Sequence, residues 1–416
     1  MRFRVGREVF GEAVAWVARA LPSRPVVPVL SGLLLRAEGG GLTLSCFDYE
    51  VSALLRAEAE VKEDGSALVP GRLLAEITRS LPASDVEVAA EADMVRLTCG
   101  SAEFELVSLP VEDYPALPDP PSPAGTVDGG ILALAAAQVV PAASRDDTLP
   151  ILTAVCLDIH GDTLTLAATD RYRMAVRDVR WAPAAPGLRA AAMVPARTLA
   201  DAARSMAAGV PVTVAFETGQ SAAGPAPAAG PGRDPRPADG VISFEAGNRR
   251  LTARLVSGEF IRYQSRFPDG FGSCAMLPAG LFTEAVRRVS LVADRASPVR
   301  LTFGSGNVVV EAQTDGRARA VETVPADFEG AERAISFNPH FLLDGLAAAA
   351  ADPARQAAAP RDDVTPDTGP GQVRLEFTSP AKPALITWSD DAGLGPEDTT
   401  PAFRYLVVPL RAPVRA

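Results

Sequence analysis

The stretch VFGEAVAWVARAL, residues 9–21, predicts an amphipathic helix, and two later stretches have the same pattern. ILALAAAQVVPAA covers residues 131–143, and LFTEAVRRVSLVA covers residues 281–293. Apolar residues recur in each at the three- or four-residue spacing of one helix face. A pattern that returns three times at long intervals is typical of a chain built from tandem structural units.

Each helix is followed by an apolar, strand-like stretch that contains an aspartate. The stretches are LSCFDYEVSALL (44–55), LAATDRYRMAV (166–176) and EAQTDGRARAV (311–321). The aspartate lies 39 residues after the first residue of the helix in the first two copies, and 34 residues after it in the third. Because order and spacing are both kept, the chain is predicted to hold three copies of one unit.

A second amphipathic helix follows each aspartate, at a proline. Pro70, Pro195 and Pro339 lie 22, 25 and 24 residues beyond the aspartates. Proline is favoured at a helix start, where the backbone N–H has no partner inside the helix. The six helices are expected at residues 7–21, 71–81, 130–142, 195–208, 278–292 and 339–350.

Apolar runs around glycine-containing turns predict β-hairpins. GLLLRAEGGGLTLSCF (32–47) turns at Gly39–Gly41, MVRLTCGSAEFELVSL (94–109) turns at Gly100, and LTFGSGNVVVEA (301–312) also holds a turn. Each copy therefore contains two helices and about eight short strands. Helices packed on an antiparallel sheet predict an α+β fold in three tandem domains.

The 416 residues are enough for three domains of about 120–140 residues each. Two proline-rich junctions place the domains at 1–124, 125–267 and 268–416. Two further segments, 218–240 and 351–371, are rich in proline, glycine and alanine. They are expected to be disordered insertions within domains, because they cannot bury enough apolar surface to become ordered.

The net charge is −11, which argues against a chain that is basic throughout. The six predicted helices nevertheless carry eight arginines against six acidic residues, so they sum to +2 and the rest of the chain to −13. This distribution fits either ordinary solvated helix faces or a mildly basic surface that attracts a polyanion. No signal peptide or membrane span is predicted, so a cytoplasmic protein is expected.

Motifs for catalysis or metal binding are not found. The four cysteines (46, 99, 156 and 274) form no CxxC pair and predict buried, reduced thiols. His160 and His340 stand in no nucleophile or metal-ligand spacing. The sequence therefore favours a binding or structural protein over an enzyme, with no cofactor and no metal.

TDRYRMAV (169–176), YLVVPLR (405–411) and SRPVVPVLSGLLL (23–35) together resemble the bacterial DNA sliding clamp, the β subunit of the replicative DNA polymerase. RDDTLPIL (145–152) and ATDRYR (168–173) resemble its high-GC Gram-positive branch. The resemblance implies a head-to-tail homodimeric ring of clamp-type domains that encircles double-stranded DNA, with helices facing the hole. It implies a processivity factor without catalysis, partnered by DNA polymerase, the clamp loader and other proteins with clamp-binding motifs, in the nucleoid-associated cytoplasm.

The resemblance also implies three sets of site residues. The expected DNA-binding residues are Arg24, Arg72, Arg145 and Arg197. The expected partner-peptide pocket comprises Leu152, Thr169, Arg171, Tyr172, Arg173, Met174, Ile261, Ser265, Arg266, Leu406, Val407, Val408, Pro409, Leu410 and Arg411. The expected dimer interface comprises Ile77, Glu103, Phe104, Leu106, Leu291, Val292, Arg317 and Arg319.

The chain departs from the family pattern in these sets. Ile261 stands where the family usually has proline, which reshapes the pocket rim. Glu103 precedes Phe104, and Arg317 and Arg319 lie on the expected opposite strand, so the interface charges are reversed relative to the usual polarity. These departures allow an alternative, a specialised second clamp that tolerates a clamp-binding antibiotic; surface drift explains the charges equally well. An enzyme on the same scaffold is the alternative of another class.

Overall fold

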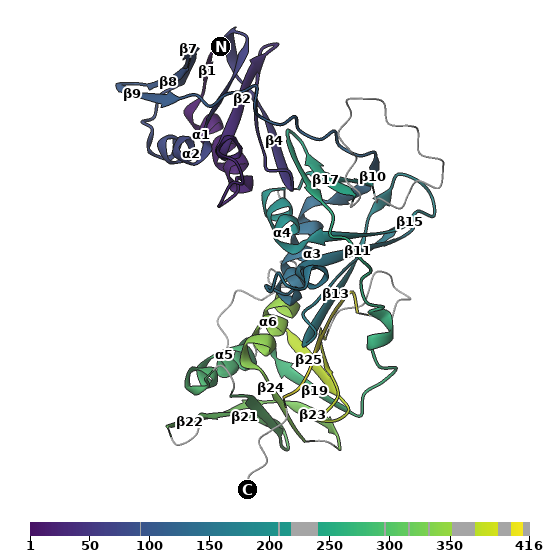
Figure 1. Cartoon of the computed structure of the whole chain (residues 1–416). Coiled ribbons are helices and arrows are strands. Elements are labelled where there is room, and N and C mark those ends of the chain that lie inside the picture. The colour runs from purple at the N-terminus through teal and green to yellow at the C-terminus, as the bar shows by residue number, and fades with distance from the viewer. Residues whose placement is uncertain are drawn as a thin grey trace. The chain divides into compact units, whose positions relative to one another are not determined.

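The computed structural model describes residues 1–91, 93–206, 209–217, 240–294, 297–314, 317–331, 333–351, 371–389 and 401–410 (Figure 1). The chain divides into two compact units. One contains residues 1–129 and 208–255, and the other contains residues 130–207 and 256–416. The predicted insertions lie outside the described residues, apart from their end residues.

All six predicted helices are present: α1 Arg7–Val17, α2 Gly71–Ser80, α3 Gly129–Val139, α4 Ala196–Ser205, α5 Ala279–Val289 and α6 Pro339–Ala350. The first helix of each copy continues into a 3-10 turn, at Ala18–Ala20, Val140–Ala142 and Ser290–Val292. The α6 helix begins where the Asn338 side chain accepts hydrogen bonds from the backbone N–H groups of His340 and Phe341. The second helices start directly after, or at, the prolines that predicted them.

The first unit contains two antiparallel sheets. One runs in the order β5 (Glu60–Glu63), β1 (Arg2–Val5), β7 (Val86–Glu91), β8 (Met94–Cys99) and β9 (Ala102–Val107). The other includes β10 (Pro123–Asp128), β16 (Pro211–Glu217), β17 (Val241–Ala246), β18 (Arg249–Arg254), β4 (Val51–Glu58), β3 (Gly41–Phe47), β2 (Gly32–Glu38) and β6 (Gly65–Pro70). The α1 helix packs on β3 and β4 and against α2 (Figure 1).

The second unit repeats this arrangement. One sheet runs β15 (Arg189–Pro195), β11 (Ala154–His160), β12 (Thr163–Thr169), β13 (Arg173–Arg180), β27 (Phe403–Val407), β26 (Ala384–Trp388), β25 (Gln372–Phe377), β19 (Ser273–Pro278) and β23 (Asp327–Gly330). The other runs β22 (Ala318–Pro325), β21 (Asn307–Thr314), β20 (Val299–Phe303) and β24 (Ala334–Phe337). Helices α5 and α6 pack together, α5 on β21 and β22 and α6 on β26 and β27.

The described aspartates of the repeat lie in turns rather than within strands. The Asp48 carboxylate accepts hydrogen bonds from the backbone N–H groups of Glu50 and Val51. The Asp170 carboxylate does the same for Tyr172 and Arg173. The residue after each aspartate is left-handed, with φ of 74° at Tyr49 and 81° at Arg171. Because an Asx turn offers the backbone these hydrogen bonds locally, it fixes where the next strand begins. The third aspartate, Asp315, lies outside the described residues.

Candidate partner-binding site

The segment TDRYR (169–173) forms a tight, fully hydrogen-bonded turn at the start of β13. The Thr169 hydroxyl donates to the Arg173 carbonyl at 2.6 Å and accepts from the Arg171 N–H at 3.2 Å. Together with the Asp170 turn, these bonds fix the backbone that carries the next side chains. The Tyr172 carbonyl then accepts from the Val408 N–H at 2.8 Å, so the turn also holds the chain beyond β27.

Successive side chains of β13 point to opposite faces of the sheet. Met174 belongs to an apolar cluster on one face, with Leu406 of β27 as a neighbour in the same cluster. Arg173 points to the other face, toward α6, where its guanidinium lies 4.5 Å from the centre of the Phe341 ring. Arg173 and Met174 therefore point to opposite faces of the sheet, and their shared place in a partner pocket stays a prediction.

The apolar cluster gathers several predicted pocket residues. Its buried members are Ala154, Cys156, Ala167, Met174, Val176, Met193, Tyr263, Leu385 and Leu406. Its half-buried members are Ile151, Val256, Phe260, Ile261, Phe267 and Phe271. Most of the half-buried members come from residues 256–271, which we call the connecting segment. The half-buried members form an accessible rim, whereas the buried members support it from below.

Polar contacts tie the connecting segment to the sheet. The Tyr263 hydroxyl donates to the Asp158 carboxylate at 2.9 Å, and burial together with this carboxylate raises the pKa of Tyr263. Arg404 of β27 bonds to Asp178 at 2.5 Å, and its guanidinium lies 5.2 Å from the centre of the Phe267 ring. Because these contacts are partly buried, they hold the segment in one position over the sheet.

The other predicted pocket residues divide by exposure. Val407 and Pro409 are buried, Leu152, Val408 and Leu410 are half-buried, and Tyr172, Ser265 and Arg266 are exposed. Val407 is completely buried, so its side chain supports the site from below rather than lining its surface. Thr169 is also buried and acts through the turn. Arg411 lies outside the described residues.

Arg173 is fully engaged within the chain. Its guanidinium bonds to Asp170 at 2.9 Å, to Asp344 of α6, and to the Tyr405 hydroxyl at 3.4 Å. Burial alone would lower the pKa of Arg173, but Tyr405 and Asp344 outweigh that effect and raise it. Burial raises the pKa of Tyr405, although the neighbouring Arg173 acts to lower it. Arg173 therefore remains charged and joins β13 to α6.

Sequence reasoning missed the aromatic residues of this site. Phe260, Tyr263, Phe267 and Phe271 recur through GEFIRYQSRFPDGFG (258–272) and could have predicted a covering segment. Phe341 stacks on Tyr172 with ring centres 6.2 Å apart. It was missed because its position in the sequence fits the apolar spacing of an ordinary helix.

The four predicted DNA-binding arginines, Arg24, Arg72, Arg145 and Arg197, are all exposed. Arg72 donates to the Pro22 carbonyl at 3.1 Å, which brings α2 beside the loop that carries Arg24. The arginines counted in the predicted helices lie in helices, except Arg19, which lies in the turn after α1. Exposed guanidinium groups are therefore present in each unit.

The predicted interface residues lie on or beside two edge strands. β9 and β22 each pair on one side only, within the described residues. On β9, Glu103 and Glu105 share Arg96 of the same chain, at 2.9 and 3.0 Å. On β22, Arg319 bonds to Glu311 at 2.8 Å. Glu103 and Arg319 therefore already have partners inside the chain, which reduces their effect on a second chain.

Exposure separates the remaining interface residues. Leu291 is 83% exposed, Phe104 and Val292 are half-buried, and Arg317 is exposed. Ile77 and Leu106 are 8% and 3% exposed, so they belong to the core of their own unit and offer little area to a partner. Each edge strand also holds an exposed valine that the sequence did not single out, Val107 on β9 and Val321 on β22.

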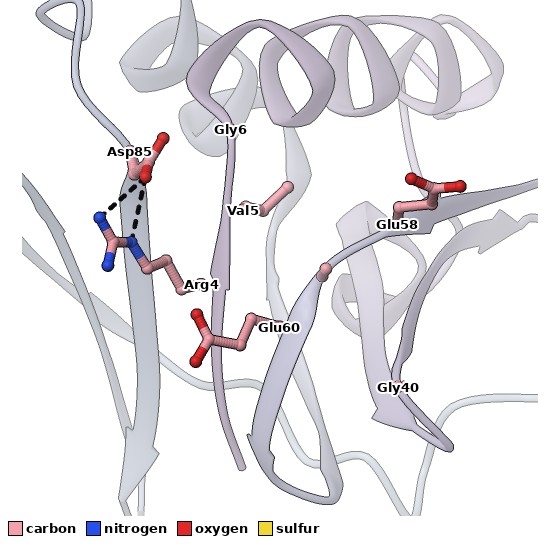
Figure 2. A pocket seen from close by; sticks show the side chains of 8 residues that line it. Arg4, Val5, Gly6, Gly40, Glu58, Glu60 and Asp85 are labelled. Atoms are coloured by element: carbon pink, nitrogen blue, oxygen red, sulfur yellow. Dashed lines mark hydrogen bonds and ion pairs between the residues drawn. The ribbon is translucent and has the colours of Figure 1, made fainter.

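A separate open hollow of about 710 Å³ lies below the start of α1 (Figure 2). Arg4 and Asp85 form an ion pair at 2.9 Å on one side of it, Glu58 lies on the other side, and Glu60 lies between them. This mixture of exposed charges presents no nucleophile beside a base. Among the described residues there is no group of metal-ligating side chains, and no helix long and apolar enough to cross a membrane.

Comparison with known proteins identifies the chain's relatives. Residues 1–118, 126–261 and 264–356 match, in order, the N-terminal, central and C-terminal domains of the DNA polymerase III beta subunit. The chain belongs to the DNA polymerase III beta subunit family, the beta sliding clamps.

Individual relatives agree with this assignment. The chain is 45% identical to the beta sliding clamp of Streptomyces coelicolor over 411 residues, which cover 99% of each protein. It is 41% identical to the beta sliding clamp homolog GriR of Streptomyces muensis over 346 residues, covering 83% of the chain and 88% of GriR. The sliding clamp of Pseudomonas aeruginosa bound to griselimycin has the same fold, with a TM-score of 0.81 at 24% identity, covering 99% and 100%.

These relationships confirm the predicted fold class of three clamp domains with helices on antiparallel sheets. The full-length similarity to an ordinary Streptomyces clamp accounts for the chain without the specialised second clamp.

Proposed function

We propose that two copies of this chain close into a ring that slides on double-stranded DNA and holds the replicative polymerase there. The observation that carries the proposal is the pairing of strands between repeated domains. Inside the chain, β4 pairs antiparallel with β18, and β13 pairs antiparallel with β27. Each pair joins the strand that follows an aspartate turn to the last strand of the next domain.

Within the described residues, the same rule leaves one strand of each kind without a partner from another domain. β22 follows the third aspartate, and β9 ends the last hairpin of the first domain. Exposed strand edges present unpaired N–H and C=O groups and readily pair with another chain. β22 of one chain on β9 of a second, made twice, closes a head-to-tail ring with two equal interfaces.

Inside such a ring the exposed arginines need only weak contacts with phosphates. Contacts of this kind are independent of DNA sequence, which suits a protein that must slide. They weaken as the salt concentration rises, because releasing counterions from the DNA is then less favourable. The acidic remainder of the chain discourages DNA from binding elsewhere. Catalysis is not part of the proposal; the clamp supports the polymerase, the clamp loader and other partners through the apolar rim at Ile261, in the cytoplasm.

Retention on circular DNA tests this function. The chain, loaded onto a nicked circular plasmid, should stay bound through gel filtration at moderate salt and should leave when the plasmid is linearised, because only a closed ring is trapped by topology. Equal loss from both forms would contradict the ring.

The arginines are tested by salt dependence. Replacing Arg24, Arg72, Arg145 and Arg197 together with Gln should reduce the slope of log affinity against log salt, by about 0.9 for each phosphate that the protein no longer neutralises. Replacement of Arg180 and Arg250, which pair with Asp162 and Glu245, serves as the control with a smaller loss of charge. An unchanged slope in the fourfold variant would remove these residues from the DNA surface.

A further inference from the structure

Two arginines of the central domain reach across the two domain junctions inside the chain. Arg249 of β18 forms an ion pair with Glu12 of α1, and its guanidinium lies 5.8 Å from the centre of the Trp16 ring. Arg249 lies in the central-domain match, whereas Glu12 and Trp16 lie in the N-terminal match. The contact therefore joins two domains within the first unit.

Arg173 makes an equivalent pair of contacts at the other junction, in addition to its bonds to Asp170 and the Tyr405 hydroxyl. It forms an ion pair with Asp344 of α6, and its guanidinium lies 4.5 Å from the centre of the Phe341 ring. Asp344 and Phe341 lie in the C-terminal match. At both junctions, then, a central-domain arginine meets one carboxylate and one aromatic ring of a neighbouring helix.

The position of each arginine in its strand is also the same. Arg249 opposite Leu55 is one end of the β18–β4 ladder, and Arg173 opposite Val407 is one end of the β13–β27 ladder. A two-stranded ladder can still twist and bend. A planar guanidinium held by a carboxylate and stacked on a ring restricts that motion, because it has a fixed orientation and lies away from the ladder.

We propose that Arg173 and Arg249 are positioning residues that fix the angle between neighbouring domains, so that two chains meet at both edges of the ring at once. The inference rests on the proposed ring. A change in either angle between domains displaces the edge strands at both interfaces between the chains. Loss of either arginine therefore weakens the closed dimer.

The chain offers matched controls on the same strands. Arg250 of β18 pairs with Glu245 at 2.7 Å, and Arg180 of β13 pairs with Asp162 at 2.6 Å. Both of these pairs stay within the central domain. Replacing Arg250 or Arg180 removes an arginine and an ion pair but leaves the junctions between domains intact.

The experiment measures domain angle and dimer strength separately. In a Cys274→Ser background, one spin-label pair at Glu8 and Pro211 spans the first junction and a second pair at Asp147 and His340 spans the other; all four positions are exposed. R249Q should broaden the first distance distribution and R173Q the second. Each should raise the dimer dissociation constant about tenfold in sedimentation, whereas R250Q and R180Q change it less than about twofold.

A charge exchange distinguishes loss of the junction contact from a general loss of stability, because only a lost contact can be restored by exchanging its two charges. R249E combined with E12R places the arginine one helical turn from Trp16, so both interactions can form again. The exchange should narrow the first distribution to the wild-type width. The inference is overturned if the arginine variants match their controls, or if the exchange leaves the distribution broad. Because the labels report on the diluted monomer, a wild type that fails to dimerise would contradict the proposed function while the distances still decide this inference.

Discussion

At the scale of the residue, neighbouring side chains in one motif have different roles. Met174 supports the apolar rim, whereas Arg173 joins domains on the opposite face of the sheet. The motif TDRYRM does not by itself separate the two roles. The alternation of a β-strand does separate them, because residues one apart never share a face.

Met174 should matter for partner peptides. Met174→Ala is expected to weaken binding of a short peptide with apolar anchors about tenfold, since such small sites depend on a few buried contacts. Isothermal titration measures the change. Met276→Ala, a half-buried methionine on β19, is the matched control and should leave the affinity unchanged. Equal losses in both variants would place the peptide elsewhere.

The buried thiols predict a loss of stability at alkaline pH. Burial raises the pKa of Cys46 and of Cys156 to about 12. Between the unfolded thiol pKa of about 8.5 and this value, the unfolded chain releases the proton and the folded chain keeps it. Folding stability therefore falls as pH rises, by up to about 1.4 kcal/mol per pH unit for each thiol.

Urea unfolding at pH 8 and pH 10.5 tests this sign. The Cys46→Ala, Cys156→Ala variant is less stable at pH 8 because of the lost side chains, but it should lose less stability than the wild type on going to pH 10.5. A steeper loss in the variant would show that the thiols ionise in the folded state.

At the scale of the element, local sequence predicted most of what the structure contains. Helices and hairpins followed from apolar spacing, prolines and glycines, and the turn at Gly39–Gly40 has the positive φ that its glycines allow. The burial of Ile77 and Leu106 could not be predicted, because the pattern of one helix or strand does not show which neighbour covers it. The cover over Met174 comes from residues 256–271, distant in sequence and without a regular period.

The packing of α6 gives a sharp test at this scale. A methyl group on Gly345 would lie 2.6 Å from ring atoms of Tyr405, a completely buried side chain. Gly345→Ala should therefore lower the free energy of unfolding by about 1–3 kcal/mol, although alanine is the better helix former. The control is Gly280→Ala on α5. An added methyl group there meets no heavy atom within 4 Å beyond its chain neighbours and its own helix backbone, so no loss of stability is expected. Denaturant unfolding of both variants decides the matter.

At the scale of the whole molecule, the repeat accounts for the strand pairing between domains as well as for the fold of each domain. The two junctions inside the chain pair β4 with β18 and β13 with β27, and β22 and β9 are the corresponding strands that the described residues leave at sheet edges. In the proposed ring, a second copy completes this set of strand pairs. The proposed function then depends on closure, since a ring can hold DNA without a tight binding site.

Apolar residues beside the β22 edge should decide whether the ring forms. Leu291 is 83% exposed and Val321 is 49% exposed, and a partner strand on β22 would cover them. Leu291→Asp with Val321→Asp should give monomers at micromolar concentration, because a carboxylate covered without a partner costs several kcal/mol. Val26→Asp, at a side chain 91% exposed on the loop with Arg24, is the control and should remain dimeric. Sedimentation equilibrium measures the masses; a double variant that stays dimeric would show that the two chains meet at another surface.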